Sequence, residues 1–248
     1  MMKIRLYTMI LWLTWGIPML AKDKAGLLVE YGAEKRLSQQ WSIALEGDFR
    51  LCNNFKTVDR VSIGAAAYYQ FNRWLKADAS YILLIQNAYE DVELDDDGSV
   101  ESWQPSSWGL RHRVHVSLTG SYRFGNNICI SLRERWQYTY QPAKTVRQWD
   151  ADEGLWEDVE RESKGKHQLR SRLQISYDQK GALLMPYTSV ELYNSMEIDK
   201  LRYTVGTQIR LGTQHTLDLF YRYQDIRHQT DVSEPDMHYI GIGYKLKF

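Results

Sequence analysis

His115 and Ser117 are the residues best placed for covalent chemistry, because they stand two positions apart in the chain. On a strand such residues point to the same side, so their side chains would be neighbours. A serine nucleophile needs a base that a third group orients, and no Asn or acidic residue lies at a suitable spacing. Arg111 and Arg113 share this face, which places it away from lipid substrates. We therefore assign no catalytic residue, and a lipid-modifying or phospholipase-like enzyme is the alternative function.

A larger set of charged residues occupies every second position of several segments, and arginine dominates it. Charged groups that leave water need partners, so these residues could pair and plug a narrow interior. They could also line a narrow path in which surplus arginine favours anions. We expect a narrow, arginine-rich and largely plugged lumen, with the anion path as the alternative. The expected network comprises Glu46, Asp48, Arg50, Arg111, Arg113, Arg133, Arg135, Arg170, Arg172, Arg202, Arg210 and Arg222.

The elements that position these residues have a period of two. In residues 41–51 the apolar track Trp41, Ile43 and Leu45 is opposed by polar and small residues, and residues 61–71, 75–85, 110–124 and 201–211 repeat the pattern. Such alternation predicts strands with one apolar face and one polar face. The final strand ends the chain, and its apolar track is Ile240, Ile242, Tyr244, Leu246 and Phe248.

Short and long connections alternate along the chain. Short ones fall near residues 38–40, 72–73, 125–127, 179–182 and 213–215, and long ones near 53–59, 88–107, 141–166, 195–200 and 227–236. This arrangement predicts an all-β fold, an antiparallel up-and-down transmembrane barrel with short periplasmic turns and longer extracellular loops. We count eleven candidate strands; since bacterial barrels close with an even number, we expect ten or twelve.

A soluble barrel with its apolar track inside would alternate in the same way. Several strands here reach eleven residues, whereas a strand of an ordinary domain has about five or six and a membrane-spanning strand about nine to eleven. The apolar track of the final strand is also typical of the signal by which outer-membrane barrels are recognised for insertion. We therefore expect the apolar face to meet lipid and the arginine-rich face to meet an enclosed centre.

Composition excludes several classes of protein. Lys and Arg total 31 and Asp and Glu total 31, which gives no electrostatic footprint for nucleic acid. A mean hydropathy of −0.50 with 25% charged residues excludes a bundle of membrane-spanning helices. Aromatic residues make up 13% of the chain, too many for a disordered polymer. Two cysteines argue against a disulfide scaffold.

The amino terminus has the layout of a secretory signal peptide. Lys3 and Arg5 precede an uncharged, mostly apolar stretch over residues 6–17, and Ala21 precedes a charged segment. The stretch is too short to cross a bilayer as a helix, although a retained helical anchor is the alternative. We expect a signal peptide over residues 1–21 and a single barrel domain over residues 22–248, located in the outer membrane of a Gram-negative-type bacterium.

Two further positions need explanation. Glu134 shares the apolar track of its strand with Ile130, Leu132 and Trp136, so it would face lipid. A charge there is costly, and a protonated carboxyl, a contact between protomers or a local misassignment would each account for it. Cys52 and Cys129 fall at opposite ends of the predicted wall, too far apart for a disulfide.

The long loops carry acidic and aromatic residues. Residues 90–101 are acidic without a basic residue, and Asp95, Asp97 and Gly98 match only part of a calcium loop. We expect a solvated loop, and we predict neither a metal nor a cofactor. Trp103, Trp149 and Trp156 could hold a ligand or pack on one another.

The assembled pattern is similar to an uncharacterised family of predicted bacterial outer-membrane β-barrels, known only as a domain of unknown function. The resemblance implies location and fold, and it supplies no activity or site residues. With it we expect a structural or small-solute transport role, contacts with membrane lipids, lipopolysaccharide and the barrel-assembly machinery, no nucleic acid, and possible oligomers through the Glu134 face. The resembling segments are residues 29–31, 41–50, 111–113, 132–135, 186–192, 201–206 and 238–248.

Overall fold

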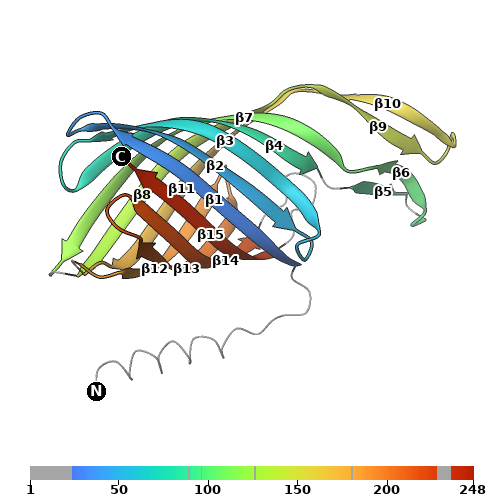
Figure 1. Cartoon of the computed structure of the whole chain (residues 1–248). Coiled ribbons are helices and arrows are strands. Elements are labelled where there is room, and N and C mark those ends of the chain that lie inside the picture. The colour runs from blue at the N-terminus through green and yellow to red at the C-terminus, as the bar shows by residue number, and fades with distance from the viewer. Residues whose placement is uncertain (1–23, 89, 96, 126, 180, 228–235) are drawn as a thin grey trace, which may run out of the picture.

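The protein is a closed β-barrel of eleven strands, seen in a computed structural model that describes residues 24–248 except 89, 96, 126, 180 and 228–235 (Figure 1). The long alternating segments of the sequence each form one barrel strand, which confirms the all-β barrel. The barrel strands are β1 (Lys24–Arg36), β2 (Trp41–Cys52), β3 (Thr57–Gln70), β4 (Leu75–Ala88), β7 (Ser107–Phe124), β8 (Ile128–Gln141), β11 (Lys164–Tyr177), β12 (Leu184–Asn194), β13 (Ile198–Arg210), β14 (His215–Ile226) and β15 (Met237–Lys247).

The expectation of an even strand number is wrong. Ten neighbouring pairs are antiparallel, and β1 closes the barrel by pairing in parallel with β15. An odd number of alternating strands gives the first and last strands the same direction, so a parallel pair must form the seam. Tyr31 stands opposite Tyr244, and the amide of Phe248 donates to the carbonyl of Glu34 at 3.0 Å. The first segment is therefore a full member of the wall.

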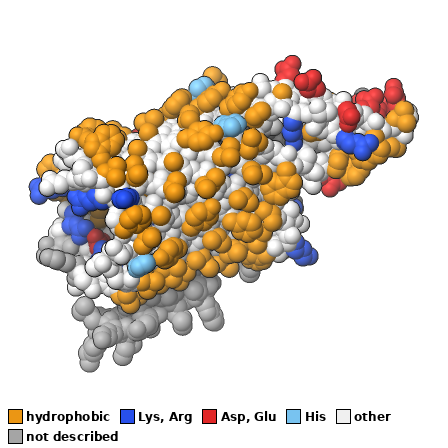
Figure 2. Space-filling model, turned by 45° about the horizontal axis from the view of Figure 1, so that its top comes forward, with side chains coloured by type: hydrophobic (Ala, Val, Ile, Leu, Met, Phe, Trp, Pro, Cys, Tyr) orange, Lys and Arg blue, Asp and Glu red, His pale blue; other side chains and the backbone are white. Residues whose placement is uncertain are grey.

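The outer surface of the barrel is apolar. Leu45, Ile63 and Val116 are 62%, 56% and 53% exposed, and apolar side chains are spread over the barrel wall in Figure 2. Exposed apolar area of this extent marks a surface that meets lipid or a partner rather than water. The track of the last strand lies on this face, with Ile240 and Phe248 57% and 55% exposed.

The long connections contain a second sheet that the sequence pattern did not predict. It has four strands in the order β10-β9-β6-β5, and it extends past the barrel rim (Figure 1). Its contacts include the pairing of Trp103 with Trp149, while the rings of Trp103 and Trp149 both lie against Trp156. The aromatic residues of the loops thus pack on one another. The strands are β5 (Asp91–Leu94), β6 (Val100–Gln104), β9 (Lys144–Asp150) and β10 (Leu155–Arg161).

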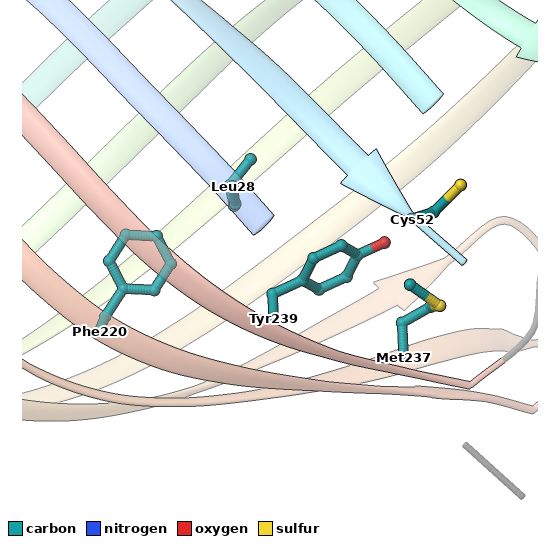
Figure 3. Close-up of a cluster of buried hydrophobic side chains, with 5 residues drawn as sticks. All are labelled: Leu28, Cys52, Phe220, Met237 and Tyr239. Carbon is teal, nitrogen blue, oxygen red and sulfur yellow. The ribbon is translucent and has the colours of Figure 1, made fainter. Parts of the chain in front are cut away.

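A small apolar cluster lies inside the barrel near its long-loop end (Figure 3). It consists of Leu28, Cys52, Phe220, Met237 and Tyr239. A Cβ at Gly241 would overlap the Phe220 ring, so glycine at this position leaves room for the ring against the inner wall. The cluster occupies one side of the interior and leaves the rest to polar side chains.

Two smaller expectations concern the cysteines and helices. Cys52 and Cys129 are thiols, and they lie at the end of β2 and the start of β8, as the sequence predicted. Among the described residues, no helix is long and apolar enough to cross a membrane.

Candidate functional site

The interior of the barrel encloses a cavity of about 850 Å³. Its lining reaches from Gln104 and Arg161, beside the long loops, to Gln208 and Lys247, near the short turns. The cavity therefore extends along most of the barrel height. Eleven of the twelve charged residues predicted for the inner network line it; Arg210, at the short-turn end of β13, does not.

One side of the cavity, here called the basic wall, carries two rows of residues. Each row runs across four neighbouring strands, and strand pairing sets its members opposite one another. Strand pairing sets Arg133 opposite Arg172 and sets Arg135 opposite Arg170, all on β8 and β11. The first row continues onto β12 and β13, and so does the second. The rows are Arg133, Arg172, Glu191 and Arg202, then Arg135, Arg170, Tyr193 and Lys200.

Glu191 is the one acidic residue among these eight. Its carboxylate accepts hydrogen bonds from Arg133 at 2.8 Å and from Arg170 at 3.0 and 3.1 Å. The hydroxyl of Tyr193 also donates to it, at 3.0 Å, and the guanidinium groups of Arg170 and Arg202 lie over the Tyr193 ring. A single carboxylate thus accepts hydrogen bonds from arginines of both rows.

Several donors of this side of the cavity have no acidic partner. Arg202 donates to Gln224 at 2.8 Å and to the Tyr193 hydroxyl, and the neighbouring Arg113 donates to Thr139 at 3.1 Å. Within the described residues, Arg172 makes no hydrogen bond or ion pair, and the Nε atoms of Arg133 and Arg170 are buried without a hydrogen-bond partner. The basic wall therefore holds positive charge in excess of its own carboxylate.

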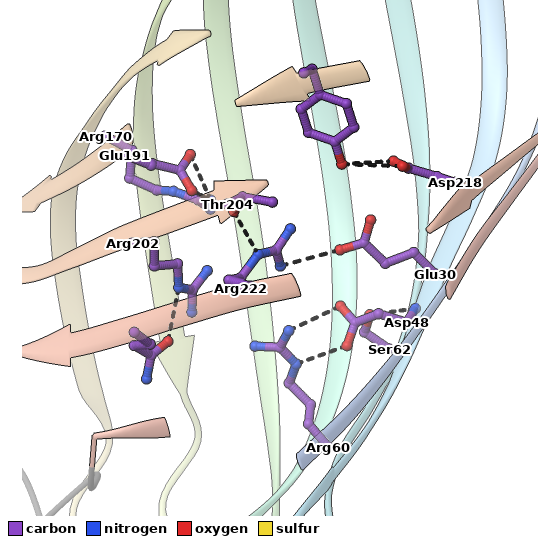
Figure 4. A network of polar contacts seen from close by, with 12 residues as sticks. Glu30, Asp48, Arg60, Ser62, Arg170, Glu191, Arg202, Thr204, Asp218 and Arg222 are labelled. Carbon is purple, nitrogen blue, oxygen red and sulfur yellow. Dashed lines mark hydrogen bonds and ion pairs between the residues drawn. The ribbon is translucent and has the colours of Figure 1, made fainter. Parts of the chain in front are cut away.

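The opposite side of the cavity, here called the paired wall, balances its charges internally. Arg60 donates twice to Asp48 at 3.0 Å, Arg222 pairs with Glu30 at 3.3 Å, and Lys245 pairs with Glu34 at 2.8 Å. Two more carboxylates accept from tyrosine hydroxyls, Asp218 from Tyr187 at 3.0 Å and Glu46 from Tyr68. Figure 4 shows the two walls across the lumen, with Arg170, Glu191 and Arg202 on one side and Asp48, Arg60 and Glu30 on the other.

The structure supplies an acidic neighbour for His115 and Ser117 that sequence spacing did not reveal. Asp78 of β4 stands opposite Ser117, whose hydroxyl donates to its carboxylate at 3.0 Å, and His115 Nε2 lies 3.3 Å from the same carboxylate oxygen. Arg135 donates to Ser117 Oγ at 2.9 Å. The serine is therefore directed at the carboxylate rather than at the histidine. All three residues are at least 93% buried, so this is a buried structural network rather than a nucleophile with its base.

Glu134 does face outward, from the strand that carries Arg133 and Arg135 on its inner side. It lies between Leu118 of β7 and Ser171 of β11, and the Ser171 hydroxyl donates to its carboxylate at 2.6 Å. The alternation of residues along the strand was enough to predict that Glu134 faces outward. It could not identify Ser171 as the partner of Glu134, because one sequence does not show the register between strands.

Outside the spanning strands, Asp178 closes the short-turn end. Burial opposes the ionisation of its carboxyl, but hydrogen bonds from Arg123 and Arg210, each 2.6 Å long, outweigh burial and hold its pKa below the ordinary value. Arg210 therefore belongs to this cluster rather than to the cavity lining.

Tyr193 and Tyr187 are two residues of the interior that sequence reasoning missed. Both alternate with Glu191 on β12, where Pro186 obscured which face was inner. Tyr187 and Tyr193 stand an even number of positions from Glu191, and this spacing could have predicted that both face the interior.

Most of the acidic segment lies in the hairpin of β5 and β6 rather than in the loop that the sequence predicted, and Asp95 stabilises the turn between the two strands. Asp95 Oδ1 accepts the backbone amides of Asp97 and Ser99 at 3.0 and 2.9 Å, and Glu90 accepts from the Trp103 indole at 2.8 Å. In the part of the chain that is described, no group of three His, Cys, Asp or Glu side chains could hold a metal ion.

The fold and its interior define a barrel with an apolar outer surface, a polar core and an arginine-rich cavity. A family model described as "Protein of unknown function (DUF2490)" matches residues 25–234, and the chain belongs to that family. Among solved structures, the β-domain of the Bordetella autotransporter BrkA is similar at 15% identity and a TM-score of 0.46, over 82% of this chain and 79% of that one. No curated protein matches.

Proposed function

We propose that this protein is an outer-membrane barrel whose lumen admits small solutes and favours anions. The observation that carries the proposal is a cavity lined from the long loops to the short turns, with surplus arginine on one wall. A narrow interior lined by one sign of charge selects ions of the opposite sign. The cavity is far smaller than the open channel of a sixteen-stranded porin, so only small solutes would fit.

The outer surface supports a location in the outer membrane. Apolar side chains cover the wall, and polar and charged side chains turn inward, as in barrels of that membrane. We further propose that the barrel-assembly machinery recognises the last strand as an insertion signal, through Ile240, Ile242, Tyr244, Leu246 and Phe248. We also propose that lipids and lipopolysaccharide contact the apolar outer surface of the barrel. The proposed signal peptide over residues 1–21 lies outside the described residues.

The parallel seam gives this location a direct test. β1 and β15 run in the same direction. β1 begins with Lys24 at the long-loop end of the barrel, and β15 ends with Lys247 near the short turns. With long loops outward, an epitope placed immediately before Lys24 will bind antibody on intact cells, and the same epitope after Phe248 will bind only after permeabilisation. The reverse pattern would contradict the orientation.

Conductance tests the passage itself. Refolded protein in a planar bilayer should give small single-channel steps, and a salt gradient should give a reversal potential of the sign expected for anions. Heat-modifiable gel migration shows beforehand that the sample has folded. A folded sample without steps would instead favour a plugged barrel of structural role.

A further inference from the structure

We infer that the basic wall is a binding site for a small oxyanion that carries at least two negative charges, such as a phosphate or pyrophosphate group. This inference rests on the proposed function, because it names the solute class that the lumen would take. Its centre is the pair of rows around Arg172, with Arg133, Arg170 and Arg202 as neighbours.

The first reason is that like charges stand directly opposite each other. Arg133 faces Arg172, and Arg135 faces Arg170, across one antiparallel strand pair. Directly opposed like charges destabilise a sheet, whereas opposed unlike charges stabilise it. Two such arginine pairs in adjacent rows are unfavourable for the empty wall. A bound anion between the guanidinium groups would turn the repulsion into attraction.

The second reason is the charge balance of the rows. Four arginines of the rows, Arg133, Arg170, Arg172 and Arg202, share a single carboxylate, Glu191, which leaves a surplus of three positive charges, while Arg135 lies 3.8 Å from the carboxylate of Asp78. Arg133 and Arg170 already share that carboxylate at 2.8 and 3.0 Å. The remaining guanidinium groups need negative charge from outside the protein, since charges withdrawn from bulk water are stabilised by partners.

The third reason is the availability of hydrogen-bond donors. Arg172 makes no hydrogen bond within the described residues although it lines the cavity, so its guanidinium group is available to a ligand there. Guanidinium groups form paired, charge-assisted hydrogen bonds with phosphate and carboxylate oxygens. Converging arginines with free donors therefore suit a ligand with several charged oxygens better than chloride.

The cavity also has a suitable size, and its surplus positive charge lies on one wall only. Its volume of about 850 Å³ falls in the range of small-molecule sites, roughly 300–1,000 Å³. The paired wall satisfies its arginines with its own carboxylates, as Arg60 does with Asp48. An anion should therefore bind to the basic wall rather than distribute along the whole lumen.

Calorimetric titration of the full folded barrel in detergent with inorganic pyrophosphate tests this site, with sodium chloride at matched ionic strength as the reference. We expect saturable binding of pyrophosphate and none of chloride. Arg172→Gln should weaken binding about tenfold or more, which corresponds to about 1.4 kcal/mol, because it removes a guanidinium group that would bind the anion. Since Arg172 makes no hydrogen bond within the described residues, the substitution removes no such bond from the fold. Arg60→Gln is the matched control from the paired wall, and it should change affinity by less than about threefold, or about 0.7 kcal/mol.

Heat-modifiable migration verifies that each variant is folded, and Arg172→Lys replaces Arg172→Gln if the latter does not fold. Absence of pyrophosphate binding to the wild-type barrel overturns the site, and so does an equal loss in the Arg60 and Arg172 variants. The conductance measurement separates the two proposals. Channel steps without saturable binding would refute the site and retain the passage, whereas binding without steps would refute the passage and retain the site.

Discussion

The two walls of the lumen use the same residue types in different ways. On the paired wall, Asp48 and Arg60 form two hydrogen bonds of 3.0 Å. On the basic wall, Glu191 alone faces Arg133, Arg170, Arg172 and Arg202, and Arg172 makes no bond in the described part of the chain. The first wall is complete without a ligand and the second is not. Arginine abundance therefore does not locate a site here, whereas the balance of charge across neighbouring strands does.

The largest effect should come from removing the one carboxylate of the basic wall. Glu191→Gln leaves Arg133 and Arg170 without an anionic partner, and loss of one member of a buried pair costs about 3–5 kcal/mol. The free energy of unfolding in urea, followed by heat-modifiable migration, measures this loss. Added pyrophosphate should restore part of it, since a ligand bound only to the folded state stabilises that state.

Glu46→Gln is the matched control for that experiment. Glu46 also lines the cavity, but its partner is the uncharged hydroxyl of Tyr68, which can still donate to the amide oxygen of the variant. The replacement should therefore cost only about 0.5–1.5 kcal/mol. Equal losses for Glu191→Gln and Glu46→Gln would remove the distinction between the walls.

A smaller effect is expected when the paired wall is broken. Asp48→Asn removes the negative charge and one of the two acceptors of Arg60, and the expected loss is about 1.5–3 kcal/mol, the range for a hydrogen bond to a charged group. Unlike the Glu191 variant, it should not be rescued by pyrophosphate, because Arg60 lies away from the two rows. Rescue of equal size would show that any unpaired arginine of the lumen can bind the anion.

The outer side of the basic wall gives a third test. Glu134 is exposed on the apolar face and bonded to Ser171. Glu134→Leu should stabilise a lone barrel by about 1 kcal/mol, because an acidic residue on the lipid face costs less than the 2–4 kcal/mol of a basic one. Urea unfolding in lipid vesicles measures the change. If the variant instead loses an oligomer on native gels, the Glu134 face is a contact between protomers, which we propose as its role in that case.

The smallest effect concerns the short-turn end, where charges are paired but exposed to solvent. The pKa of Asp178 is lowered, so its contribution to stability is present above the unfolded-state pKa and is lost as pH falls through the folded-state value. Asp178→Asn should therefore cost less than about 1 kcal/mol at neutral pH. The difference from the wild type should vanish in acid, once the pH lies below the lowered folded-state pKa of Asp178. A difference that persists at lower pH would mean that the amide changes the turn itself.

Much of the architecture follows from the sequence, since side chains alternate across a strand whatever that strand pairs with. The alternation along each strand predicts that Arg133 and Arg172 face inward and that Glu134 faces outward. It also predicts that the apolar track of the final strand lies on the outer face, and the structure has all of them there. The strand count was also visible, although the rule of even numbers pointed away from eleven.

The sequence could not show which residues meet across strands. Register brought Asp78 to Ser117, Ser171 to Glu134 and Arg172 to Arg133, and the hairpins beyond the rim arose in stretches without a long alternating pattern. Alternation is a local property of the backbone, so a single sequence indicates the facing of residues wherever the alternation is regular, which it is not around Pro186 of β12. Register, the parallel seam and the charge balance of a wall depend on how distant strands align, and only the closed barrel decided them.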